Sequence, residues 1–178
     1  YLVGDKKNIP IHIMKYMNHY KFVELDSNSD DYYKKAAAKG VEIIRDGKGQ
    51  MLMKGKLNTA DFAKAVLNKD KGISTDRRLS LVSLFELPEI DRLIFLTDPG
   101  INPALVSGHD LETSMDIINN AIDVARGFGI VHPKVALLEA NEIPSEKLPS
   151  TLFEKQLSEM EWPDADVFGP LSYDLALY

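Results

Sequence analysis

The sequence contains no cysteine, and this absence removes several kinds of site at once. A disulfide-stabilised fold, a zinc site built on thiolates and a cysteine nucleophile are all excluded. Basic residues are also outnumbered, because 21 Lys and Arg stand against 27 Asp and Glu, for a net charge of −6. Without a concentrated basic stripe, nucleic acid is not expected as the main partner.

Long apolar runs are missing too, since none approaches the ~18 residues that a membrane-spanning helix requires. We find no signal peptide before the first motif, and the lack of cysteine suits a reducing cytoplasm, which is the location we expect. The remaining composition, 44% hydrophobic and 27% charged, is that of a globular protein with a sizeable core. The sequence begins without methionine, at what reads as the end of a strand, and stops where a helix would start. We therefore expect residues to be absent on both sides.

Apolar runs alternate with longer amphipathic stretches along the whole chain. This alternation favours an α/β architecture with a largely parallel sheet that is covered on both faces. Residues 78–87 and 92–98 predict an antiparallel hairpin instead, because only a four-residue turn containing Pro88 separates them. The sheet is therefore expected to be mixed. The pattern predicts the other strands at residues 21–25, 50–55, 133–140 and 164–170, and helices at 30–45, 58–69, 109–127 and 149–160.

The stretch "MLMKGKLNTADFAKAV" (51–66) has the layout of an anion site at a helix N-terminus. Gly55 would let the backbone turn and approach a ligand closely. Asn58 or Thr59 could cap the following helix, and Asp61 completes a weak capping box. Free N–H groups at such a helix start bind anions, and the neighbouring lysines add positive charge.

This stretch is not a Walker A motif, because Gln50 stands where the first glycine is needed and Leu57 follows the lysine. A GxGxxG fingerprint is absent as well. The alternative is a glycine turn and a capped helix with solvated lysines, and on chemistry alone the two interpretations are about equally supported.

Four longer segments carry a family resemblance: "LMKGKLNTADFAKAVLNKDKGI", "RLSLVSLFELPEIDRLIFLTDPGIN", "IINNAIDVARGFGIVHPKVALLEANE" and "FGPLSYDLAL". In this order they resemble the phosphate butyryltransferase branch of the phosphate acetyl/butyryltransferase family, nearly continuously over the chain. The resemblance implies an enzyme that interconverts butyryl-CoA, or a branched short-chain acyl-CoA, and phosphate with acyl phosphate and CoA. It implies no metal and no prosthetic group, with CoA as a substrate.

The same resemblance implies two three-layer α/β/α domains of the isocitrate/isopropylmalate dehydrogenase type, with the active site between them. Residues 1–104 would form most of the first domain and residues 105–178 part of the second, both incomplete. A homo-oligomer, at least a dimer, is implied as well.

Substrate-binding positions follow from the family pattern residue by residue. Gly55 and Thr59 match its glycine turn and helix start, which would form the phosphate end of the cleft. Lys64 stands where relatives often carry arginine, so it can supply charge but not the guanidinium fork. Arg77 and Ser80 match a second motif, in which Leu81 replaces a histidine that is common in relatives.

Asp98 and Asn102 match the "LTD" before the domain crossover and the asparagine after it. Each of these positions also has a purely structural interpretation. Asp98 could bond its own backbone in a turn, Ser80 could satisfy a neighbouring carbonyl group, and Arg77 could be surface charge. The four histidines, which show no metal-ligand spacing and receive no catalytic role, are His12, His19, His109 and His132.

The catalytic residues are not assigned, because the family's Ser-Arg pair with a downstream Asp has no match among these 178 residues. Asp174 is interpreted as a helix-cap or interdomain residue. Two alternatives to a butyryltransferase remain open. One is a phosphate acetyltransferase, and the other is a non-catalytic module that binds CoA or acyl phosphate.

Overall fold

The computed structural model describes residues 1–102 and 111–177. By internal contacts the chain divides into two compact units, Tyr1–Asp76 and Arg77–Tyr178. The predicted domain boundary between residues 104 and 105 lies outside the described residues and stays a prediction. His109 lies outside them as well.

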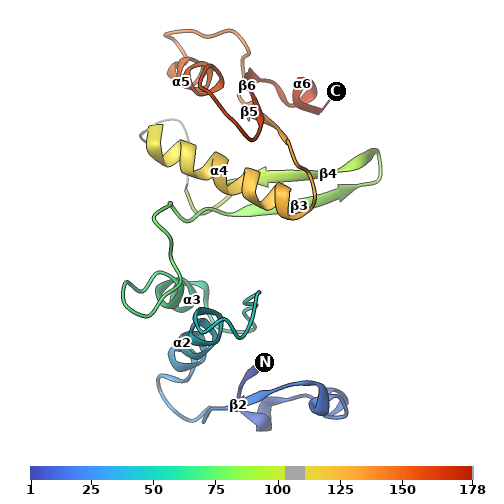
Figure 1. Ribbon diagram of the computed structural model, residues 1–178, viewed down its shortest axis with the longest axis vertical. Coiled ribbons are helices and arrows are strands. Elements are labelled where there is room, and N and C mark those ends of the chain that lie inside the picture. The colour runs from blue at the N-terminus through green and yellow to red at the C-terminus, as the bar shows by residue number, and fades with distance from the viewer. Residues whose placement is uncertain (103–110, 178) are drawn as a thin grey trace. The chain divides into compact units, whose positions relative to one another are not determined.

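The first unit contains a short parallel strand pair and two packed helices (Figure 1). β1 (Leu2–Gly4) pairs in parallel with β2 (Phe22–Glu24). α2 (Tyr32–Arg45) contacts both β1 and α3 (Thr59–Val66). Short helical turns connect β1 to β2: η1 (Lys6–Asn8), α1 (Ile11–Met14) and η2 (Met17–His19).

The strand predicted at residues 50–55 is wrong, because this segment pairs with no strand of the described chain. Met51 and Met53 are 82% and 84% exposed. Only Leu52 turns inward, against Gly40 of α2, where an added Cβ would lie 2.9 Å from Leu52 Cδ1. A short apolar run does not reveal by itself whether a partner strand exists, which explains the error.

The second unit contains the predicted hairpin, which is confirmed, although its first strand begins at Val82 rather than Arg78 and its turn spans two residues rather than four. β3 (Val82–Leu87) pairs antiparallel with β4 (Ile90–Thr97) around a turn at Pro88 and Glu89. α4 (Leu111–Gly127) lies along this hairpin (Figure 1). The helix is followed by Gly129, whose φ of 89° is a left-handed conformation that glycine adopts readily.

The rest of the second unit is a parallel strand pair with a covering helix. β5 (Lys134–Leu138) pairs with β6 (Asp166–Leu171), and α5 (Pro149–Ser158) packs on β6. α6 (Tyr173–Leu177) follows β6 directly. The core of this unit is formed by apolar residues of α4, α5 and the region of β6: Ile118, Ile122, Leu157, Ala165 and Val167.

The molecule is thus a mixed α/β protein, as the sequence predicted, with both parallel and antiparallel pairing. The strands form three separate two-stranded sheets in the described residues rather than one broad parallel sheet. Among those residues, no helix combines the length and the apolar character needed to cross a membrane.

Candidate functional site

The N-cap residue of α3 is Asn58, whose Oδ1 accepts a hydrogen bond of 2.8 Å from the backbone N–H of Asp61. Asn58 Nδ2 also donates to Asp61 Oδ2 at 2.8 Å. Of the two predicted capping residues, the structure therefore selects Asn58. The hydroxyl group of Thr59, at the first helical position, is not needed for the cap.

The three site residues predicted in this unit, Gly55, Thr59 and Lys64, are all exposed. A Cβ added at Gly55 would meet no described atom within 4 Å. The side chains of Thr59 and Lys64 make no hydrogen bond or ion pair with residues 1–102 or 111–177. The start of α3 therefore has polar groups and open space available to a ligand.

In the second unit, the buried side chain of Asn102 joins the two ends of the hairpin. Asn102 is only 2% exposed. Its Nδ2 donates to Asp98 Oδ2 at 2.6 Å and to the carbonyl oxygen of Leu79 at 2.8 Å. Its Oδ1 accepts from Arg78 Nε at 3.1 Å. One amide thus ties the residues before β3 to the turn after β4.

Asp98 accepts hydrogen bonds from its own turn, which confirms the structural interpretation of this residue. Oδ1 accepts from the N–H groups of Gly100 (3.1 Å) and Ile101 (2.9 Å). Burial acts to raise the pKa of the Asp98 carboxyl group, but these bonds and the one from Asn102 outweigh it and hold the pKa below its ordinary value. Asp98 is therefore a charged turn residue at neutral pH, and its oxygens are already occupied.

A polar face of α4 holds the segment that contains Arg77 and Ser80. Asn120 Nδ2 donates to Ser80 Oγ at 2.9 Å and to the carbonyl oxygen of Arg78 at 2.8 Å. Arg77 Nη1 contacts Asp123 Oδ2 at 2.6 Å, and the two side chains are 43% and 59% exposed. Ser80 thus accepts from a side-chain amide, and Arg77 forms a surface ion pair.

Sequence reasoning missed this polar face, although a signal for it exists. Asp116, Asn120 and Asp123 follow one another at spacings of four and three, which places them on one side of a helix. Asp116 Oδ2 accepts from the backbone N–H of Arg78 at 2.7 Å. Apolar periodicity on a helix predicts a buried face, whereas polar periodicity does not show whether that face contacts another part of the chain.

The structure therefore brings together the four residues predicted in the second unit. Hydrogen bonds of Asn102 connect Asp98 to the segment of Arg78 and Leu79. Arg77 and Ser80 flank this segment in the sequence. The residues of the first unit form a group of their own at α3. In the described residues, no group of three or more His, Asp or Glu side chains is arranged to hold a metal ion.

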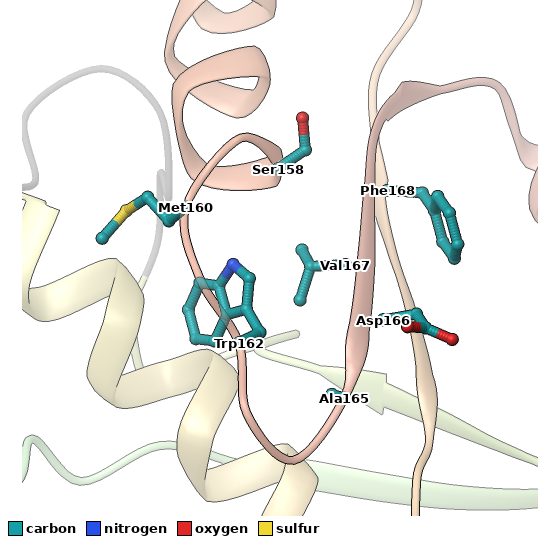
Figure 2. A pocket seen from close by; sticks show the side chains of 7 residues that line it. All are labelled: Ser158, Met160, Trp162, Ala165, Asp166, Val167 and Phe168. Atoms are coloured by element: carbon teal, nitrogen blue, oxygen red, sulfur yellow. The ribbon is translucent and has the colours of Figure 1, made fainter.

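Two shallow hollows of the described structure are lined by other residues than the predicted site residues. One, of about 270 Å³, lies between the end of α5 and β6. Figure 2 shows Trp162 and Val167 on one side of β6 and Phe168 on the other. The Trp162 Nε1–H donates to the carbonyl oxygen of Leu157 at 2.8 Å. The second hollow, of about 740 Å³, lies at the hairpin turn, along residues 86–93.

Comparison with known proteins places the chain in a family. Residues 14–178 match the family model described as phosphate acetyl/butaryl transferase. The chain belongs to this family. It is 40% identical, over 183 aligned residues, to a phosphate butyryltransferase of Clostridium acetobutylicum, an alignment that covers 99% of this chain and 58% of that protein.

Other relatives agree with this placement. The chain is 38% identical over 146 residues to a phosphate acetyltransferase of Rhizobium meliloti, covering 80% of this chain and 45% of that protein. The crystal structure of a branched-chain phosphotransacylase from Enterococcus faecalis V583 superposes with a TM-score of 0.68 and 26% identity, over 99% of this chain and 70% of that one. The chain thus spans about half the length of these curated relatives, 58% of the first and 45% of the second.

Proposed function

We propose that the protein carrying this chain is a phosphate acyltransferase. It would interconvert butyryl-CoA, or a branched short-chain acyl-CoA, and inorganic phosphate with acyl phosphate and CoA. The observation that supports this most strongly is the family match over residues 14–178, together with the 40% identity to a phosphate butyryltransferase along nearly the whole chain.

The reaction sets clear physical demands. A phosphate oxygen attacks the thioester carbonyl carbon, a tetrahedral intermediate forms, and the C–S bond breaks to release CoA as a thiolate that then takes up a proton. Two anionic substrates must be held together, so cations and helix N-termini are needed. The carbonyl oxygen gains charge in the transition state, and a donor must face it; losing such a donor costs ~10²–10³ in rate in comparable sites.

We assign phosphate binding to the start of α3. Gly55 offers open space, Lys64 is an exposed cation, and the Thr59 hydroxyl group makes no hydrogen bond with any described residue. Arg77, Ser80, Asp98 and Asn102 are proposed as the second group of substrate-binding residues. The polar atoms of Asp98 and Asn102 already have hydrogen-bond partners, which favours a structural role for these two residues. Ser80 and Arg77 would then be nearer to the substrate.

The catalytic residues themselves are proposed to be a Ser-Arg pair and a downstream Asp that these 178 residues do not contain. We further propose two domains of the isocitrate/isopropylmalate dehydrogenase type, a cytoplasmic location and at least a dimer. Metal is not required in this proposal, because the substrates' charges are balanced by side chains and backbone N–H groups.

Phosphate acetyltransferase activity is a second candidate. It is supported by the 38% identity to the phosphate acetyltransferase of Rhizobium meliloti over 80% of the chain. The two activities differ in the size of the acyl pocket, and a few methylene groups supply only ~1–3 kcal/mol of discrimination.

The test uses the full-length protein with phosphate and a series of acyl-CoA substrates, from acetyl-CoA to butyryl-CoA and isobutyryl-CoA. Release of free thiol measures turnover, and each reaction is repeated with EDTA. We expect the highest kcat/KM with butyryl-CoA or isobutyryl-CoA and no loss with EDTA. A preference for acetyl-CoA would favour the second candidate, and no turnover with any short acyl-CoA would contradict both.

A further inference from the structure

The buried face of α5 includes one ionisable side chain, Glu154, that the proposed reaction does not use. Four residues of this helix are buried: Ser150, Thr151, Glu154 and Leu157. Glu154 is only 6% exposed, and its Oε2 atom makes no hydrogen bond with any described residue. The Oε2 atom is therefore shielded from solvent without a hydrogen-bond donor among the described residues.

An ionised carboxylate in such a place would be strongly unfavourable. A buried charge without a partner loses its hydration and gains nothing in return, so the group keeps its proton instead. We infer that Glu154 is a buried, protonated carboxylic acid, and that its ionisation weakens the packing of α5 on β6 as the pH rises toward neutrality.

The charged residues on the elements next to Glu154 do not relieve this penalty. Glu139, directly after β5, has the same sign and acts against ionisation. Lys155, the neighbour on α5, is 3.6 Å from Glu159, and Asp166 on β6 is 3.2 Å from His132. Burial first, and repulsion from Glu139 second, raise the pKa of Glu154 to about 7.

The direction of the pH dependence follows from this. In the unfolded chain Glu154 loses its proton near its ordinary pKa of 4.5, whereas in the folded unit it keeps the proton up to about pH 7. Between these values the folded state binds more protons, so its stability falls as the pH rises. The unfolding equilibrium constant would increase by up to about tenfold per pH unit in this window, and the effect would be complete above it.

The test compares urea unfolding of the full protein from pH 5 to pH 8 with that of Glu154→Gln, which keeps the shape but cannot ionise. Glu146→Gln, an exposed carboxyl group just before α5, is the matched control. Between pH 5 and 7, the ionisation of Glu154 should raise the unfolding equilibrium constant of the unaltered protein by up to about tenfold per pH unit. We expect this contribution to be absent in Glu154→Gln and retained in the control. An identical dependence in Glu154→Gln and the unaltered protein would overturn the inference.

A second measurement covers the case in which Glu154→Gln fails to fold. The infrared spectrum of the unaltered folded protein should show the carbonyl band of a protonated carboxylic acid at pH 6, and the band should disappear by pH 8. Glu139→Gln should move this transition to lower pH, because a like charge is removed. Absence of the band at pH 6 would overturn the inference.

Discussion

At the start of α3, the side chains of Thr59 and Lys64 are exposed and have no polar partner in the part of the chain that the structure describes, whereas around the hairpin of the second unit the residues proposed for substrate binding are fixed by hydrogen bonds or an ion pair. The side chain of Asn102, for example, forms hydrogen bonds with Asp98, Leu79 and Arg78. Both groups are proposed to bind substrate, but their surroundings differ. An unengaged hydroxyl or ammonium group is available to a ligand, while a buried and satisfied amide holds the chain together.

This difference predicts how each group responds to substitution. Loss of an engaged residue leaves buried partners unsatisfied and lowers the free energy of unfolding. Loss of an unengaged residue leaves the free energy of unfolding nearly unchanged and affects only what the residue binds. Three substitutions test the comparison.

Asn102→Ala should have the largest effect. It would leave the carbonyl group of Leu79 and the carboxylate of Asp98 without their amide donor in a partly buried place, so the free energy of unfolding should fall by about 2 kcal/mol. Urea denaturation measures this. The control is Asn141→Ala, an exposed asparagine whose Oδ1 accepts a local hydrogen bond of 3.0 Å from the N–H of Ile143. Equal effects of the two substitutions would show that Asn102 does not hold the hairpin.

Thr59→Val should have an intermediate effect, on binding rather than on folding. If the hydroxyl group donates to phosphate, the phosphate KM of the full protein should rise about tenfold while the unfolding midpoint stays nearly constant. Asn58→Ala is the reference for cap loss and should cost about 1 kcal/mol of stability. An unchanged phosphate KM in Thr59→Val would leave this residue with a helix-start role only.

Arg77→Ala should have the smallest effect on folding, below about 1 kcal/mol, because its ion pair with Asp123 is exposed on both sides. Steady-state kinetics then decide between surface charge and substrate binding. A rise in the KM for acyl-CoA or phosphate that Asp123→Asn does not reproduce would assign the guanidinium group to substrate. If both substitutions change the kinetics equally, the ion pair itself is what matters.

The sequence predicted those elements whose signals are local. The hairpin of β3 and β4 followed from two apolar runs around a proline turn, and α4 followed from its apolar periodicity and its terminal glycines. The strand at residues 50–55 was wrong because pairing depends on a partner elsewhere in the chain. For Asp98 the turn interpretation was available from the sequence, since aspartate commonly bonds the backbone two or three residues on.

The links to α4 could not be predicted in the same way. Asn120 lies 40 positions from Ser80, and Asp123 lies 46 from Arg77. Such contacts depend on how a helix is rotated against a hairpin, which no local pattern specifies. The polar face of α4 was visible in the sequence, but its partners were not.

By itself, the sequence determined the α/β character, the family, the hairpin and the residue types at the candidate sites. Each of these depends on side-chain chemistry and on spacing along the chain. Only the tertiary structure decided that Asn102 is buried and bonded, and that the Thr59 hydroxyl group and the buried Oε2 atom of Glu154 make no hydrogen bond with a described residue. The physical reason is that burial and hydrogen-bond satisfaction belong to a three-dimensional neighbourhood, which distant parts of the chain create together.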